Sequence, residues 1–257
     1  MTGLGMVTPI GNTVDESWQA ALAGTSGVVT NPYFDTEDYS AKICAPVKDF
    51  DITQYMSVKE ARRIDGFIQF GMAAGSQAIA DAGLEAHPDD ADRIGIAIGS
   101  GIGGINLIEE THSTLLKSGP RRVSPFFVPG SVINMISGNL SIKYGFKGPN
   151  IAIVTACTTG THNIGFGARM IQYGEADVMV SGGTEAPIVP LSVAGFAAMK
   201  ALTEQVAAGD FDAVLTWDTN PGYTVPGWSE AISKAAPKSI ALALTADETA
   251  STAAVVF

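Results

Sequence analysis

Short apolar segments alternate with helix-forming segments over residues 93–183, and this order constrains the fold more than any other feature of the sequence. The predicted buried strands are 93–99 (RIGIAIG), 151–156 (IAIVTA) and 177–183 (DVMVSGG). Segment 100–119 begins with a glycine turn and continues into a predicted helix. Two further helices are predicted at 132–144 and 158–174. Apolar strands joined by helices are typical of a mostly parallel sheet covered by helices. The sequence therefore predicts an α/β fold.

Two more helices are predicted before the first strand. Segment 15–24 is a short helix that Asp15 can cap. Segment 59–83 carries apolar side chains at helical spacing, which predicts one long helix with a buried face that ends at Gly83. Farther along the chain, the two prolines of 124–131 (SPFFVPGS) predict an extended loop.

The composition changes near residue 203. Beyond it, a strand (FDAVLTW), a helix (GWSEAISKAA) and a second strand (SIALALT) predict a compact βαβ unit. Two of the three tryptophans also lie in this region. We therefore expect two domains, 1–202 and 203–257, the second being a small C-terminal βαβ unit of different origin.

The charge of the chain limits its partners. A formal net charge of −11 argues against nucleic acid or an anionic membrane as the main partner. An acidic protein partner would need a local basic patch on this surface. Two clusters qualify, Lys59 with Arg62 and Arg63, and Lys117 with Arg121 and Arg122. Ordinary solvated surface charge is the alternative explanation for both.

Composition also indicates the cellular compartment. Hydrophobic residues make up 46% of the chain and charged residues 16%, which favours a packed core over disorder. Cys44 and Cys157 are too few for a disulfide framework, and no Cys/His spacing predicts a metal site. We expect no signal peptide, membrane span or cofactor, and a reducing, cytoplasmic location.

Cys157 is the candidate nucleophile. It lies between the predicted strand 151–156 and a helix that begins at Cys157 or just after it. The free backbone N–H groups and the dipole of a helix N-terminus favour the thiolate form of a cysteine. A strand-to-helix turn also points its side chain out of the sheet, as nucleophile elbows do. A buried, inert cysteine is the alternative explanation, and the sequence leaves both open.

Four motifs together resemble one protein family. The run TACTTGTHNIG (155–165) is similar to the A-C-[ST]-[ST]-G active-site stretch of β-ketoacyl-acyl carrier protein synthases. TGLGMVTPIGN resembles the opening turn of that family, SGIGG with SPFFVP its acyl-pocket loops, and ADVMVSGGTEA its strand after the nucleophile helix. The resemblance covers about residues 1–202, the N-terminal half of the family, and is strongest to the synthase II branch.

This resemblance implies a thiolase-like half fold and a decarboxylating Claisen condensation in fatty-acid elongation. Cys157 would carry the acyl chain as a thioester, and its backbone N–H would form half of an oxyanion hole. Gly101, Ile102, Phe127 and Ala156 would line the acyl site, although core packing equally explains Ile102 and Phe127. The implied partners are acyl carrier protein, acyl and malonyl thioesters, and a second copy of the chain in a homodimer.

The histidines do not supply the rest of the machinery. The resemblance implies that the two catalytic histidines and the lysine belong to the second half of the family, whose motifs are absent from these residues. His162, five residues after Cys157, does not match a catalytic position of the family, and we expect His87 and His112 at the surface.

The last fifty residues leave other functions open. FDAVLTWDTNPGYTVPG and the segments after it faintly resemble molybdopterin-type oxidoreductases, although N-P is also a common turn signal. Three functions are therefore open: a condensing enzyme, an acyl-binding or assembly protein without catalysis, and a subunit of a larger redox complex.

Overall fold

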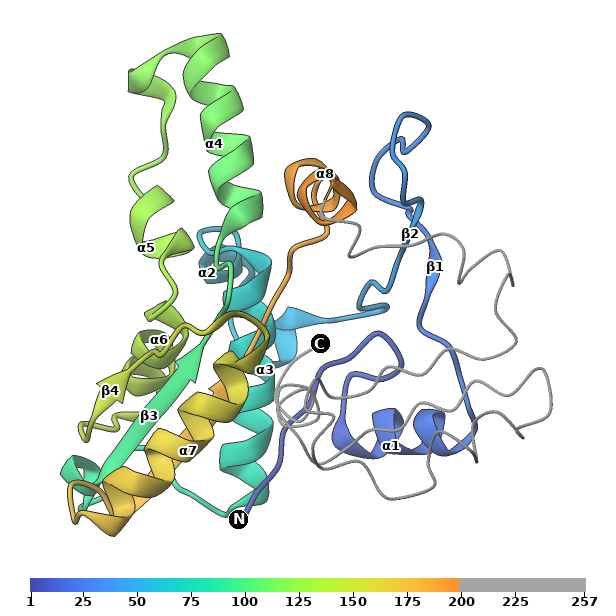
Figure 1. Ribbon diagram of the computed structural model, residues 1–257. Helices are drawn as coiled ribbons and strands as arrows, with labels where there is room; N and C mark the ends of the chain where they lie inside the picture. Colours follow the sequence, from blue (N-terminus) through green and yellow to red (C-terminus); the bar gives the residue numbers. More distant parts are fainter. Residues whose placement is uncertain (199–257) are drawn as a thin grey trace.

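A three-stranded parallel sheet forms the centre of the protein. The computed structural model of the 257-residue chain describes residues 1–198. The strands are β3 (Ile94–Gly99), β4 (Asn150–Ile151) and β5 (Val178–Gly183), in the order β4-β3-β5. Figure 1 shows β4 beside β3, and β3 also pairs with β5 over its whole length, from Ile94 opposite Val178 to Gly99 opposite Gly183. The predicted α/β fold is confirmed, and so are the strands predicted at 93–99 and 177–183.

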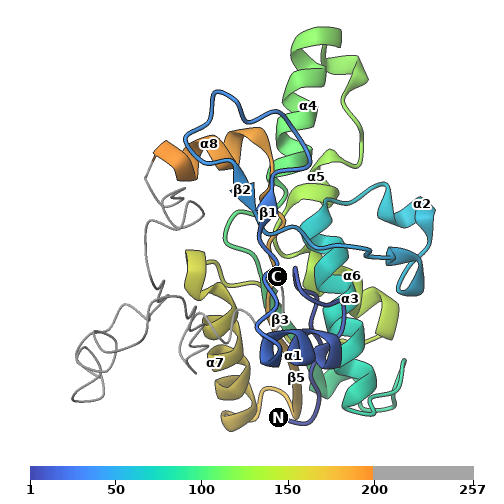
Figure 2. The ribbon, with the colours of Figure 1, turned by 90° about the vertical axis from the view of Figure 1, so that its right-hand side faces the viewer.

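Helices cover both faces of this sheet. The helices α3 (Gly66–Asp81) and α6 (Met135–Tyr144) lie on one face, and α7 (Thr159–Gln172) lies on the other (Figure 2). Because side chains alternate along a strand, Ile94, Ile96 and Ile98 of β3 point together into the core. That core also contains side chains of α3 and α6, including Phe67, Ile68, Ile136 and Leu140.

Small residues let α7 approach the opposite face closely. A Cβ on Gly99 would lie 2.7 Å from the Nδ2 of Asn163, and one on Gly183 would lie 3.0 Å from the backbone of Gly160. The start of α7 is therefore pressed against the carboxyl ends of β3 and β5. This contact fixes the position of the residues just before the helix.

The remaining elements surround this centre. They are α1 (Val14–Leu22), the antiparallel pair β1 (Val29–Thr30) and β2 (Ile43–Cys44), α2 (Val58–Ala61), α4 (Ile105–Ser118), α5 (Phe127–Ser131) and α8 (Pro190–Ala198). The helices α4 and α5 project together beyond one end of the sheet (Figure 1). Among residues 1–198, no helix is long and apolar enough to cross a membrane.

The cap predicted for the first helix is wrong by two residues. Thr13, in an extended conformation, caps α1 by accepting a hydrogen bond from the backbone N–H of Glu16. Asp15 lies in the first turn, where its charge still favours the helix dipole.

The single long helix predicted at 59–83 is also wrong, because the chain forms α2 and α3 instead. Asp65 is extended, with φ −67° and ψ 160°, and its side chain caps α3 by accepting from the N–H of Phe67. The backbone N–H of Asp65 donates to the carbonyl of Gly130 rather than within a helix. A tertiary contact therefore outweighs the apolar periodicity. The predicted end is nearly right, since Gly83 has φ +67° just beyond α3.

Two further predictions need correction. The extended loop predicted at 124–131 contains the short helix α5, in which Pro129 is tolerated because it lies in the first turn. The strand predicted at 151–156 pairs with β3 only through Asn150 and Ile151. The helix predicted at 132–144 begins at Met135, and the helices expected within 100–119 and 158–174 are confirmed. The βαβ unit and the boundary near 202 fall outside the described residues.

Candidate active site

The carboxyl ends of the parallel strands bring three chain segments together. β3 continues into the glycine loop Ser100–Gly104, and β5 continues into Thr184 and Glu185. The N–H of Thr184 donates to the carbonyl of Gly99 at 3.0 Å, which holds these two exits side by side. The start of α7 supplies the third segment. This edge of an open parallel sheet is where α/β proteins commonly bind ligands.

Cys157 lies exposed on a strained turn at this edge. It is the middle residue of a single 3-10 turn, Ala156–Thr158, and α7 begins at Thr159. Ala156 has φ +52°, a left-handed conformation that costs a residue with a Cβ about 1 kcal/mol or more. The helix therefore begins just after Cys157, as predicted, and the alternative of a buried cysteine is wrong.

The segment before Cys157 is held by the side chains of α7 instead of by strand pairing. Asn163 is fully buried, and its Oδ1 accepts from the N–H of Ile153 while its Nδ2 donates to the carbonyls of Ile153 and Thr159. The Oγ1 of Thr159 accepts from the N–H of Thr155 at 3.0 Å. These hydrogen bonds replace the backbone hydrogen bonds that a longer β4 would have made with a neighbouring strand. The sequence analysis missed Asn163, for which the one signal was an amide inside a helix otherwise rich in small residues.

Two more contacts fix the same segment. The Oγ1 of Thr158 donates to the carbonyl of Thr155 at 2.6 Å. The Nδ1 of His162 lies 2.8 Å from the Oγ1 of Thr155, so this exposed histidine helps to orient the turn. The side chains of His87 and His112 are exposed, as predicted.

Gly101 lies between the Cys157 turn and a buried carboxylate. A Cβ at position 101 would lie 2.8 Å from the Oε1 of Glu185, 3.1 Å from the carbonyl oxygen of Ala156 and 3.2 Å from its Cα. Only glycine fits there without displacement. The structure thus brings together Gly101 and Ala156, two of the predicted acyl-site residues, beside Cys157.

Glu185 is a site residue that the sequence analysis did not single out. Its Oε1 accepts hydrogen bonds from the backbone N–H groups of Gly101 and Ile102. Burial raises the pKa of the Glu185 carboxyl, and these two backbone hydrogen bonds partly oppose that increase. Its partners lie 84 and 83 residues earlier in the chain, so no local pattern could have indicated them.

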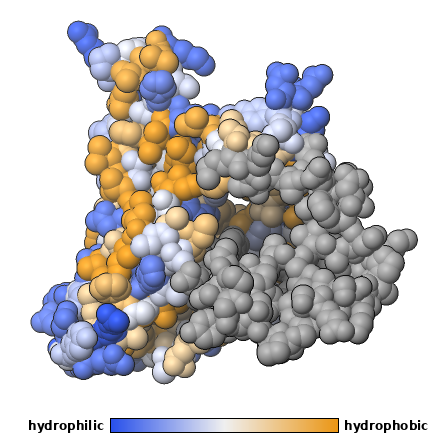
Figure 3. All heavy atoms as spheres, viewed as in Figure 1, coloured by the Kyte–Doolittle hydropathy of each residue, from blue (hydrophilic) through white to orange (hydrophobic). Residues whose placement is uncertain are grey.

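An open apolar groove lies next to this edge. Its lining includes Ile102, Ile108, Val132, Ile133, Ala152 and Val154. Figure 3 shows hydrophobic side chains gathered over α4 and α5 and continuing toward the β4 edge. Ile102 and Val154 connect the groove to the glycine loop and to the segment before Cys157. Phe127 is half-buried at the start of α5 and does not line the groove.

The other candidate groups lie elsewhere. Cys44 is half-buried in β2, and burial raises the pKa of its thiol, with Lys48 acting in the opposite direction. Lys59 and Arg62 are exposed on and just after α2, while the guanidinium of Arg63 lies 4.3 Å from the ring centre of Phe126. Lys117, Arg121 and Arg122 are exposed near the end of α4. Within residues 1–198, no three acidic, histidine or cysteine side chains form a cluster suited to a metal ion.

Comparison with known proteins gives a consistent family. The model of the "Beta-ketoacyl synthase, N-terminal domain" matches residues 1–225. The chain is 60% identical over 203 residues to 3-oxoacyl-[acyl-carrier-protein] synthase 2 of Vibrio cholerae serotype O1 and 54% identical to that of Coxiella burnetii. Each match covers 79% of this chain and 49% of the relative. The chain therefore spans about half the length of the curated relatives it matches.

Solved structures agree with this result. A β-ketoacyl synthase from Burkholderia phymatum superimposes with a TM-score of 0.66 at 28% identity, over 77% of this chain and 49% of that one. A type II polyketide ketosynthase bound to its acyl-carrier protein gives a TM-score of 0.66 at 27% identity, over 78% and 54%. The thiolase-like half fold that the sequence predicts is thereby confirmed.

Proposed function

The chain belongs to the β-ketoacyl synthase family, and from this premise we propose that it acts in fatty-acid elongation, with Cys157 as the acyl-accepting residue of a 3-oxoacyl-[acyl-carrier-protein] synthase. The observation that carries the proposal is the exposed Cys157 on the left-handed turn between sheet and helix, next to an apolar groove. A thiol in this setting is accessible to a thioester, and the groove offers a place for an alkyl chain.

The proposed first step transfers the acyl group from the sulfur of the carrier to the sulfur of Cys157. The Cys157 thiolate attacks the carbonyl carbon of an acyl thioester on the carrier, the bond from that carbon to the carrier sulfur breaks, and the carrier thiolate takes a proton. The backbone N–H of Cys157 stabilises the oxyanion of the tetrahedral intermediate. Gly101, Ile102 and Ala156 form the acyl site in this proposal, while the place of Phe127, which lies outside the groove, rests on the resemblance alone. The close approach of Gly101 to Ala156 and the place of Ile102 in the groove support it.

The second step forms the new carbon–carbon bond. A malonyl thioester loses carbon dioxide, and its carbanion attacks the Cys157 thioester and releases the thiolate. The resemblance implies that this step uses two histidines of the second half of the family, whose motifs are absent from this sequence. We therefore propose that acyl transfer to Cys157 proceeds in this chain, and that condensation requires groups supplied by the second half of a family member.

We also propose acyl carrier protein as the partner, docking on one of the two basic clusters. Electrostatic attraction to an acidic partner depends on exposed charge, which Arg62 and Arg121 both offer. Replacing each arginine separately by glutamate and measuring the carrier concentration that gives half the maximal rate of Cys157 acylation would identify the cluster. The cluster that docks the carrier should show this concentration raised about tenfold or more, and unchanged values for both variants would contradict docking at either.

A homodimer in the cytoplasm completes the proposal. β4 has only one neighbour among the described strands, and the exposed apolar side chains of Val132 and Val154 line the groove together with Ala152, the residue after β4. An unpaired edge beside apolar surface is suited to pairing with a second copy.

The test of the function is acyl transfer followed by intact mass. The chain is incubated with an acyl-loaded carrier protein, and we expect a mass increase of one acyl group. The Cys157→Ala variant should show no increase, while Cys44→Ala, which removes the other thiol, should behave as the unmodified chain does. An adduct that persists in Cys157→Ala would overturn the proposal, and so would the absence of any adduct on a folded chain.

A further inference from the structure

The carboxylate of Glu185 organises the glycine loop that follows β3. Its Oε1 accepts from two consecutive backbone N–H groups, those of Gly101 and Ile102, the second at 3.0 Å. Two adjacent amides that converge on one oxygen form an anion-binding cradle, which the chain fills with its own side chain. The orientation of this loop is therefore set by a residue from the neighbouring strand.

The same carboxylate sets the distance between the loop and the Cys157 turn. Gly101 has Glu185 on one side and the backbone of Ala156 on the other, with no room for a Cβ between them. A shift of Glu185 would release Gly101 away from Ala156. The neighbouring Ile102, which lines the apolar groove, would move with it.

Other contacts of the loop lie farther along it. The Oγ of Ser100 accepts from the N–H of Gly103 at 2.9 Å, and the Oδ2 of Asp65 accepts from the N–H of Leu107 at 2.7 Å. These bonds hold the later part of the loop and the start of α4. Neither of them reaches Gly101 or Ile102, so the part of the loop that faces Cys157 depends on Glu185.

We propose that Glu185 is a positioning residue for alkyl-chain selection at Cys157. By holding the N–H groups of Gly101 and Ile102, it keeps the groove aligned with the thiol, so that a long alkyl chain bound to the groove presents its reactive carbon to the sulfur. The link to acyl substrates rests on the proposed function. The geometry that Glu185 imposes is testable with simple alkylating reagents.

The experiment compares two iodoacetamides on the full chain in a Cys44→Ala background. The rate constant of Cys157 alkylation is measured with iodoacetamide and with N-octyl iodoacetamide, and the ratio of the two reports chain selection. Glu185→Ala should lower this ratio about fivefold or more, because misplacement of a positioning group typically has effects of that order. Glu185→Gln keeps an oxygen that can accept both N–H groups, and its ratio should stay within about twofold of the parent.

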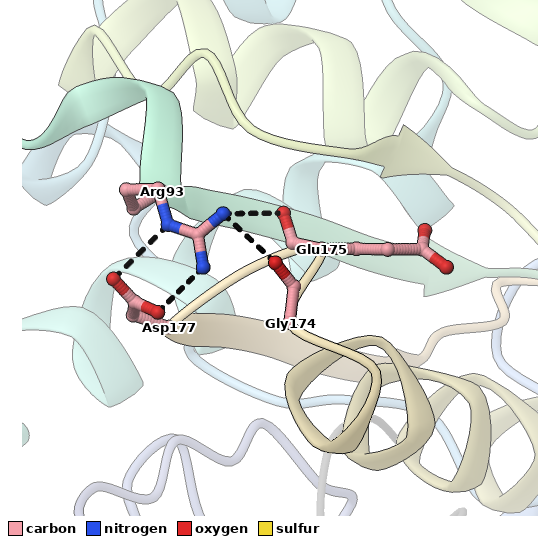
Figure 4. Close-up of polar contacts among 4 residues, drawn as sticks. All are labelled: Arg93, Gly174, Glu175 and Asp177. Atoms are coloured by element: carbon pink, nitrogen blue, oxygen red, sulfur yellow. Dashed lines mark hydrogen bonds and ion pairs between the residues drawn. The ribbon is translucent and has the colours of Figure 1, made fainter.

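Glu175→Gln is the matched control, since it makes the same chemical change at the other end of β5. The carbonyl of Glu175 accepts from Arg93, while its side chain extends away from that cluster (Figure 4). Its ratio should equal that of the parent. Circular dichroism establishes folding, and Glu185→Asp, which is one methylene too short to reach both amides, replaces the alanine variant if that variant is unfolded.

The outcomes separate this inference from the proposed function. A ratio lowered in Glu185→Ala and kept in Glu185→Gln supports the positioning role, even if a carrier protein fails to acylate Cys157. An unchanged ratio in the alanine variant overturns the role, as does an equal loss in both variants, even if carrier-dependent acylation succeeds.

Discussion

At the scale of single residues, the two cysteines have different surroundings. Cys157 is exposed on the turn before α7, whereas Cys44 is half-buried in β2. Burial raises the pKa of Cys44, so its reactive thiolate forms at a higher pH than that of an ordinary exposed thiol. Accessibility and thiolate content together control the rate at which a cysteine is alkylated.

We therefore expect Cys157 to be alkylated faster than Cys44 near neutral pH. Rates measured by mass spectrometry on the two single variants, Cys44→Ala and Cys157→Ala, would check this. The rate at Cys44 should still be rising with pH in the alkaline range, because burial raises the pKa of its thiol above the ordinary value. Equal rates at pH 7 would count against the difference in surroundings.

Residues differ in how far their roles could be predicted from sequence. The position of Cys157 just before a helix was predictable because its signal is local: a strand, a cysteine and a helix follow one another in the chain. Glu185 and Asn163 were not. Glu185 acts on backbone groups 83 and 84 residues away, and Asn163 completes the hydrogen bonds of a strand that local propensity predicted to continue.

At the scale of elements, side chains of α7 hold the segment that precedes Cys157 through hydrogen bonds to its backbone. The side chain of Asn163 makes both hydrogen bonds of Ile153 that a neighbouring strand would normally make. The strand predicted at 151–156 ends early because these side chains satisfy the backbone from the helix side. The exposed fraction of Val154, 48%, likewise departs from the predicted buried strand.

Asn163→Leu should destabilise the protein by about 2–4 kcal/mol. The substitution keeps the branched shape of the side chain but leaves the partly buried N–H and carbonyl of Ile153 without partners, and each such group costs about 1–3 kcal/mol. The free energy of unfolding in urea would check the value. The exposed Asn134→Leu, just before α6, where the side chain makes no capping hydrogen bond, is the matched control and should change stability by less than about 0.5 kcal/mol. A loss below about 1 kcal/mol for Asn163→Leu would contradict the assigned role.

An ion pair between Arg93 and Asp177, here called the charged clamp, joins the residues just before β3 and β5, at the end of the sheet away from Cys157. Arg93 donates to both carboxylate oxygens of Asp177, at 2.7 and 3.1 Å, and to the carbonyls of Gly174 and Glu175 (Figure 4). The hydrogen bond from Arg93 holds the pKa of Asp177 below its ordinary value of 3.8. The clamp therefore fixes the start of β5 after the turn that follows α7.

This clamp makes a pH-dependent contribution to stability. Because the folded pKa of Asp177 is lowered, its contribution is fully present above the unfolded value of about 4 and is lost as the pH falls through the folded value. Asp177→Asn should thus lower the free energy of unfolding near neutral pH. It should also make the fall of that free energy with decreasing pH, the acid limb, less steep below about pH 4. Urea unfolding from pH 2.5 to 7 would check this, and an acid limb that is as steep in the variant as in the parent would contradict it.

The bounds of α2 and α3 could not be predicted from local sequence patterns alone. Apolar spacing predicted one helix across 59–83, but Asp65 interrupts it and bonds instead to α4 and α5, through Leu107 and Gly130. These partners lie far along the chain. The pattern of short helices in this region therefore depends on packing that only the folded protein supplies.

At the scale of the whole molecule, the parallel sheet and its covering helices were predicted from the sequence, because alternating apolar strands and helices permit few topologies. The strand order β4-β3-β5 was not predicted. The residues after 198 lie beyond the described part, so the predicted βαβ unit and the boundary at 202–203 stay predictions. The family model matches up to residue 225, across that predicted boundary. Limited proteolysis tests the predicted boundary, for which we expect cleavage near 202–203.

The account as a whole depends on Cys157 accepting an acyl group. The most direct measurement is peptide mapping by mass spectrometry after a single exposure of the chain to acyl-loaded carrier protein. We predict the acyl mass on the peptide that contains Cys157, released by hydroxylamine as a thioester is, and none on the peptide that contains Cys44. A chain that stays unmodified while folded, or an acyl group found on Cys44 instead, would contradict the account.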